Sequence, residues 1–240
     1  MNLSFEMLLV IGVAGFYLFD SAMLLYTNEL VFVENNGKWI FSSPQKNAQI
    51  LKKFLYLPNP FRPDKHIFSL YWSASEPIKT KTDKGDIQKL FLALKPLRYM
   101  TCFLLVLLFF GLPLLVFILG TGAMLLLLIE AIYLTILLML IHVYLFKDML
   151  KLSDKTFAKL AFDSLICAPF ALNLLRKITL QHSLGDPIDF ASQNFDVNRY
   201  ASLIEVLQKQ VIQKLQYTDE NTAIYNDLKK YQDKLSRMAL

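Results

Sequence analysis

The sequence predicts an α-helical integral membrane protein with three transmembrane helices, a small cytoplasmic α+β module and a C-terminal helical hairpin. All twenty-five Lys and Arg residues lie in two blocks, Lys38–Arg98 and Lys147–Arg237, whereas Met1–Gly37 and Tyr99–Phe146 carry none. Hydrophobic residues make up 55% of the 240 residues, and the mean hydropathy is +0.39. A bilayer accounts for this pattern because hydrocarbon excludes fixed charge, and basic flanks stay on the cytoplasmic side.

Three apolar segments are long enough to cross a bilayer, for which about 20 residues suffice. They are residues 1–27, which we interpret as an uncleaved anchor, and Tyr99–Gly120 and Gly122–Phe146. The latter two are separated by a minimal turn, so residues 99–146 are expected to form a transmembrane helical hairpin. With both basic blocks inside, the N-terminus lies outside and the C-terminus inside, as in a multi-pass protein of the cell inner membrane.

Residues 147–182 are interpreted as an interfacial amphipathic helix. Four lysines recur every four residues and predict a basic stripe that faces anionic lipid head groups. They are Lys147, Lys151, Lys155 and Lys159. Pro169 is expected to break or kink the helix. A re-entrant segment remains open, and a fourth span is disfavoured because it would move the basic tail outside.

Residues 28–98 predict a small cytoplasmic α+β module. Asn35-Asn36-Gly37 separates two β-prone runs within Leu30–Ser42, and Asn-Gly is a strong hairpin signal. Gln45–Leu55 has helical spacing, and His66–Trp72 predicts a third strand. The core of so small a module is limited, so we expect it to pack against the membrane or the C-terminal part.

Residues 183–240 predict a cytoplasmic helical hairpin, because two apolar stripes at helical spacing are separated by a polar break at Thr218–Thr222. The first stripe contains Tyr200, Ile204, Leu207 and Val211. The second contains Ile224, Leu228, Tyr231, Leu235 and Met238. Packing against the α+β module is the preferred interpretation of the second stripe. Docking of a protein partner, or contact with a second copy, is the alternative.

Three ionisable residues lie inside the predicted spans, where charge is costly: Asp20, Glu130 and His142. We expect Asp20 and His142 to share a level near the cytoplasmic interface and to contact each other. A neutral Glu130 is expected to donate to the Phe109 carbonyl that Pro113 frees. Helix packing is the preferred role of these residues, and proton, ion or lipid coupling is the alternative.

Gly12, Gly15 and Ala22 fall on one stripe of the first predicted span. Small residues allow close helix approach, so this stripe either seats the first span on the hairpin or forms a homodimer face.

Two further segments have unusual compositions, LPNPFRP at Leu57–Pro63 and the run Cys167–Lys177. We attach neither to an activity.

No catalytic, nucleotide or metal motif is present, and Cys102 and Cys167 have no partner at metal-ligand spacing. We therefore expect no catalytic residues, metal or cofactor. The lysines are scattered without an Arg-rich stripe, which argues against nucleic-acid binding. The sequence favours a non-enzymatic scaffold or accessory subunit that docks a protein partner, a second copy or anionic lipid at the cytoplasmic face. The alternatives are a small enzyme acting on lipid-linked substrates and an oligomeric channel or transporter subunit.

Overall fold

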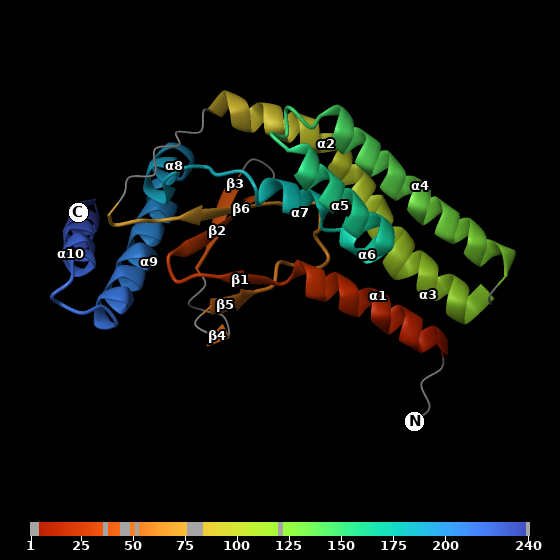
Figure 1. Ribbon diagram of the computed structural model, residues 1–240, viewed down its shortest axis with the longest axis horizontal. Helices are drawn as coiled ribbons and strands as arrows, with labels where there is room; N and C mark the ends of the chain where they lie inside the picture. The colour runs from red at the N-terminus through yellow and green to blue at the C-terminus, as the bar shows by residue number, and fades with distance from the viewer. Residues whose placement is uncertain are drawn as a thin grey trace. The chain divides into compact units, whose positions relative to one another are not determined.

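The computed structural model describes residues 5–35, 38–43, 49–50, 53–75, 84–119 and 122–238 (Figure 1). The described chain is mostly helical with a small β component, as predicted, and it divides into two compact units. Unit 1 consists of Met1–Ala22, Leu57–His66 and Lys84–Thr179. Unit 2 consists of Met23–Tyr56, Ile67–Asp83 and Leu180–Leu240. Each unit is therefore assembled from three separate stretches of chain.

Unit 1 is helical. Its helices are α1 (Phe5–Ser21), α2 (Lys84–Val106), α3 (Leu112–Leu114), α4 (Ala123–Leu145), α5 (Asp154–Ile166), α6 (Ala168–Ala171) and α7 (Leu174–Thr179). Two helical stretches are long and apolar enough to cross a membrane, Gly85–Phe117 and Ala123–Leu145. Each has a mean hydropathy of 2.7 in its most apolar window, and only 28% of that window is buried. This agrees with the predicted hairpin segment, although the first helix begins well before Tyr99.

The first of these helices passes through Pro113 without ending. Because proline has no N–H, the regular hydrogen-bond ladder is interrupted, and π-helical turns at Leu107–Gly111 and Leu115–Leu119 flank α3. The N–H of Leu112 donates to the carbonyl of Leu107, five residues back. A Cβ added at Gly111 would lie 3.1 Å from Leu128 Cδ1 on α4, so this glycine allows the two helices to approach closely.

The first predicted span is shorter than expected. Helix α1 ends at Ser21 and has 17 residues, which corresponds to about 25 Å against a hydrocarbon thickness of about 30 Å. Met23–Leu25 instead forms strand β1, in which Leu25 packs with Val31 and Ile67 in the core of unit 2. Within the described residues, two helices are thus of spanning length where three were predicted.

The prediction of one amphipathic helix over residues 147–182 is wrong, because the structure has three helices there. Lys151 has a φ of 48°, and Ser153 caps a new helix by accepting a hydrogen bond from the Thr156 N–H. Cys167 is extended and separates α5 from α6, whose first turn contains Pro169. The two later helices are largely buried, with α6 packed against both α1 and α4 (Figure 1).

Unit 2 contains two small sheets. The first has strand order β1–β5–β4 and the second β3–β2–β6. The further strands are β2 (Glu29–Asn35), β3 (Lys38–Ser42), β4 (Gln49–Ile50), β5 (Lys53–Tyr56) and β6 (His66–Tyr71).

The predicted β-hairpin is confirmed, because β2 and β3 pair antiparallel with Asn35 opposite Lys38. Its turn residues lie outside the described part of the chain. Strand β6 confirms the third predicted strand. The helical spacing of Gln45–Leu55 is misleading, because the described residues of this segment belong to β4 and β5, with Phe54 buried within unit 2. The other residues of that segment, 45–48 and 51–52, are not described.

The helices of unit 2 are α8 (Pro187–Asn194), α9 (Val197–Gln216) and α10 (Ala223–Met238). Asp186 and Asp196 begin α8 and α9 as N-caps, accepting hydrogen bonds from the backbone N–H groups of the first turns. Helices α9 and α10 lie side by side as the predicted hairpin (Figure 1).

An aromatic cluster joins the second sheet to α8. The Phe32 ring is fully buried, stacks with Phe195 at 5.6 Å between centroids, and meets Phe190 edge-on at the same distance. Trp39 packs edge-on against Phe190 at 4.8 Å. These contacts bury the apolar face of the β2–β3 hairpin beneath a helix that lies about 150 residues further along the chain.

We predict that Phe32→Ala destabilises unit 2 by about 3–5 kcal/mol, because it removes a buried ring and leaves a cavity. Both tryptophans of the chain, Trp39 and Trp72, belong to unit 2, so denaturant unfolding followed by tryptophan emission reports on this unit. The matched control is Val197→Ala at an 83% exposed site, where we expect a change within about 0.5 kcal/mol. An equal effect of the two substitutions would contradict the assigned core.

Candidate functional site

A buried arginine connects the two segments of unusual composition in unit 1. Arg176 is only 3% exposed. Its Nη2 donates to the backbone carbonyls of Asn59 (2.7 Å) and Arg62 (2.9 Å). Its Nη1 donates to the side-chain oxygen of Asn173 at 3.1 Å. The guanidinium therefore satisfies carbonyls of the proline-rich Leu57–Pro63 loop, which has no regular secondary structure to pair them.

The same network holds the end of α1. Asn173 Nδ2 donates to one Asp20 oxygen at 2.9 Å and to Ser21 Oγ at 3.0 Å. Lys177 Nζ lies 2.8 Å from the other Asp20 oxygen. The Tyr17 hydroxyl donates to the Pro60 carbonyl at 2.6 Å. Helix α7 and the Leu57–Pro63 loop are thus both tied to α1 by hydrogen bonds.

A second charged group lies beside the loop at Asp64. Its carboxylate is 3.2 Å from Arg62 Nε, 3.5 Å from Arg98 Nη2 and 3.8 Å from Lys65 Nζ. Burial acts to raise the pKa of Asp64, but the hydrogen bond from Arg62 and the three positive charges outweigh it. The pKa of this carboxyl is therefore lowered from its ordinary value.

The predicted contact between Asp20 and His142 is wrong, because each residue has other partners. Asp20 pairs with Lys177 and Asn173, as described above. The His142 Nε2 lies 2.7 Å from the Ala93 carbonyl on α2. Both residues join helices, in agreement with the preferred packing role, but they do so at separate points of unit 1.

Glu130 does not contact the carbonyl of Phe109, so that prediction is also wrong. Its side chain is exposed on the outer side of α4, among apolar neighbours that are also exposed. The gap in the ladder at Pro113 is accommodated within the helix by the π-helical turns.

The small-residue stripe does not seat α1 on the hairpin. A Cβ added at Gly12 or Gly15 would meet no heavy atom within 4 Å, and Ala22 is exposed. A homodimer face at this stripe remains a prediction.

The second apolar stripe of the C-terminal hairpin is used mainly inside unit 2. Leu228, Tyr231 and Leu235 are buried, and the Tyr231 ring stacks on Trp72 at 5.5 Å between centroids. Ile224 and Met238, at the two ends of α10, are 57% and 38% exposed. Three of the five docking candidates therefore serve internal packing, which was the preferred interpretation.

The basic stripe is divided by the break before α5. Lys147 pairs with Asp154 at 2.5 Å and Lys151 with Asp86 at 3.1 Å. Lys155 and Lys159 lie on α5 with exposed side chains.

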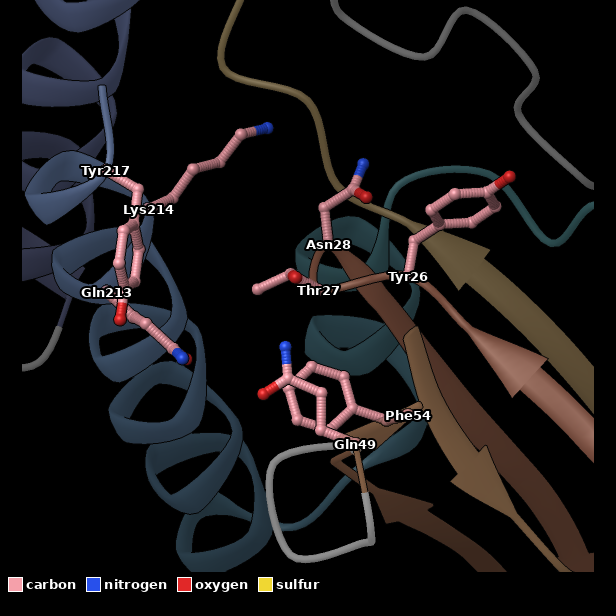
Figure 2. A pocket seen from close by; sticks show the side chains of 8 residues that line it. All are labelled: Tyr26, Thr27, Asn28, Gln49, Phe54, Gln213, Lys214 and Tyr217. Atoms are coloured by element: carbon pink, nitrogen blue, oxygen red, sulfur yellow. The ribbon is translucent and has the colours of Figure 1, made fainter. Parts of the chain in front are cut away.

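Unit 2 contains a cavity of about 600 Å³ at the end of α9. It is lined by Tyr26, Thr27, Asn28, Gln49, Phe54, Gln213, Lys214 and Tyr217. The side chains of Gln213 and Lys214 extend from the helix toward the turn between β1 and β2 (Figure 2). Ligand pockets commonly have volumes of 300–1,000 Å³, so this cavity is large enough for a small organic molecule.

Among the described residues that line the cavity, Lys214 is the one cation and none is acidic. Its ammonium lies 5.3 Å from the centroid of the Trp72 ring, whose Nε1 donates to Gln210 at 2.7 Å. Burial lowers the pKa of Lys214 from its ordinary value. The side chain of Lys214 thus borders a lining of amides, hydroxyls and rings, with its partly desolvated ammonium over the Trp72 ring.

Sequence reasoning found neither the role of Arg176 nor the cavity. For Arg176 a signal existed, since a single arginine follows a long apolar run in a segment already noted as unusual. The cavity residues come from three distant stretches and share no spacing, so only the fold brings them together.

No family model matches the chain, and no curated protein or solved structure matches it either. Within the part of the chain that the structure describes, no three His, Cys, Asp or Glu side chains form a metal-ligating group.

We predict that Arg176→Met lowers the apparent melting temperature of the detergent-solubilised protein by roughly 5–10 °C, since buried carbonyls left unpaired cost about 1–3 kcal/mol each. Size-exclusion chromatography after heating measures this loss. Lys159→Met, which removes an exposed cation from the same unit, is the control and should change little. Equal melting temperatures of the two variants would contradict the structural role of Arg176.

Asp64 predicts a specific pH dependence. A carboxyl whose pKa is lowered by folding contributes stability above its unfolded pKa of about 3.9, and this contribution is lost as the pH falls through the folded pKa. Asp64→Asn should therefore be less stable than the native protein at pH 7, with a difference that shrinks below about pH 4. Melting temperatures at pH 7, 5 and 3 test this, with the exposed Asp148→Asn as control. A difference independent of pH would be inconsistent with the ion pairs.

Proposed function

We propose that this chain is a non-enzymatic, membrane-anchored docking protein of the cell inner membrane. Unit 1 is its membrane anchor, and unit 2 is a cytoplasmic binding unit that uses the cavity at the end of α9. The observation that carries the proposal is the outward orientation of apolar side chains on the two long helices of unit 1.

Helices α2 and α4 expose the side chains that a water-soluble protein would bury. A helix in the core of a soluble protein is mostly buried, whereas these two are 28% buried in their most apolar windows. The outward residues of the stretch Gly85–Phe117, which begins in α2, and of α4 include Phe103, Phe110, Phe117, Leu126, Leu127, Leu134 and Leu138. Surface of this kind and extent is stable in lipid and not in water.

The ends of these helices carry residues typical of a membrane interface. Arg98 and Tyr99 on α2, together with Tyr144 and Lys147 at the end of α4, provide the basic and aromatic residues that favour head groups. The Asp20–Lys177 pair attaches α1 to this basic end of unit 1. We propose that α1 is a third, short span, with its N-terminus outside and the C-terminus of the chain inside.

Helix α5 supports contact with anionic lipid. Lys155, Lys159, Phe162 and Ile166 recur at 4-3-4 spacing and are exposed on one face. The lysines occupy the first half of the helix and the apolar residues the second, which suits a helix that enters an anionic interface at an angle. We therefore retain the proposal that this segment contacts anionic lipid, with Lys155 and Lys159 as the contacting residues in place of all four predicted lysines.

One observation favours a second candidate, an oligomeric channel or transporter subunit. Glu130 is exposed on α4, and a carboxyl that faces lipid near the middle of a span is costly. A neighbouring protomer that covers Glu130 would relieve this cost. The oligomeric state in a bilayer separates the two candidates, because a docking protein does not require a ring of protomers.

We predict that the chain stays in the membrane fraction after alkaline carbonate extraction, because the exposed apolar surface of α2 and α4 is stable in lipid and not in water. Native mass determination of the gently solubilised protein then identifies what is bound. A defined protein partner or retained anionic lipid supports docking.

Release of the chain by carbonate would contradict membrane integration. A solubilised chain that carries neither partner nor lipid would contradict docking, and a closed ring of identical chains would favour the channel.

A further inference from the structure

We propose that the cavity of unit 2 binds the phosphate ester of a polyol or sugar, with Lys214 contacting the phosphate and the amide side chains contacting the hydroxyl groups. This inference rests on the proposed docking role of the cavity and names the chemical class that it recognises.

The charge of the lining favours an anion. Lys214 is half-buried, and among the described residues no carboxylate lies within ion-pair distance of its ammonium. Its neighbour Lys209, by contrast, pairs with Glu205 at 2.6 Å on the exposed side of α9. A cation beside a lining in which no described residue is acidic attracts a phosphate.

The neutral part of the lining suits hydroxyl groups. Asn28, Gln49 and Gln213 each have an amide that offers both donors and an acceptor, and a hydroxyl group both donates and accepts. Asn28 Nδ2 donates to the Trp72 carbonyl at 3.2 Å, which orients the side chain at the cavity. Thr27 adds a further hydroxyl (Figure 2).

Aromatic rings provide the apolar contacts that a polyol or sugar also needs. Phe54 is 6% exposed, whereas Tyr217 is 84% exposed and accessible to a ligand. The Tyr26 ring points away from the cavity (Figure 2). Ring faces accept the C–H groups of a carbohydrate, while the amides accept its hydroxyls. A volume of about 600 Å³ is ample for a monosaccharide phosphate and leaves room for ordered water.

The same phosphate ester chemistry occurs in two sources, the head group of a glycerol phospholipid and a soluble polyol phosphate. The test therefore uses two probes with the full chain. The soluble probe is glycerol 3-phosphate, titrated calorimetrically into protein in detergent. The lipid probe is a nanodisc with phosphatidylglycerol, compared with one of phosphatidylcholine alone. Free glycerol tests whether the phosphate is required.

We expect saturable binding of at least one of these probes and no binding of glycerol. Lys214→Met should weaken binding about tenfold or more, because a hydrogen bond to a charged group is lost. Lys209→Met removes the same charge from the same helix outside the cavity and should leave affinity unchanged. Gln49→Ala, at an exposed lining residue, should weaken binding less than Lys214→Met.

Binding of the soluble probe alone supports the inference and assigns a soluble ligand, and binding of the lipid alone assigns a head group. Failure of both probes, with native tryptophan emission preserved, overturns the ligand class. Equal weakening by Lys214→Met and Lys209→Met overturns the site. Either result would leave the membrane anchor and the docking of a protein partner untouched, because these are tested separately by carbonate extraction and by what co-purifies with the chain.

Discussion

The arrangement of unit 1 depends on the buried guanidinium of Arg176. Three elements meet there: the loop Leu57–Pro63, helix α7 and, through Asn173 and Asp20, the end of α1. The loop contains three prolines and cannot pair its carbonyls in regular structure, so a fixed donor must do so. A planar group with several N–H donors suits this task, and lysine would not reach the same set of acceptors.

This polar centre contrasts with the outer surface of the same unit. Its long helices bury one apolar face, which includes Leu104, Ile136 and Val143, but they also direct many apolar side chains outward, unlike the helices of a water-soluble bundle. Hydrogen bonds between buried polar groups are stronger in surroundings of low dielectric constant. A lipid exterior around unit 1 would therefore strengthen the hydrogen bonds of Arg176. Unit 2 has an aromatic core around Phe32 and most of its charged residues outside, with Glu29 and Glu34 as buried exceptions. Unit 1 thus departs from the ordinary pattern through its outward apolar surface, and we interpret the two units as a membrane anchor and a binding unit.

Sequence patterns predicted those elements whose signal is local. The Asn-Gly hairpin, the paired stripes of α9 and α10 and the two long apolar helices each follow from short-range spacing or composition. Strand β1 was missed because Met23–Leu25 continues the hydropathy of α1 and pairs with residues 30 positions away. Helix α5 was merged with its neighbours because lysine spacing alone does not show the cap at Ser153. The Arg176 network and the Lys214 cavity depend on contacts across more than 100 residues, which no window of sequence contains.

Accessibility of single cysteines in sealed membranes tests the membrane anchor most directly. In a background in which Cys102 and Cys167 are replaced by alanine, Phe110→Cys and Leu126→Cys place thiols on the outward faces of the stretch Gly85–Phe117 and of α4. Ser192→Cys places one at an exposed position of α8. We predict that a water-soluble maleimide leaves the first two unmodified and labels Ser192→Cys from the cytoplasmic side only. Labelling of Phe110→Cys and Leu126→Cys as fast as Ser192→Cys would contradict the assignment of these faces to lipid.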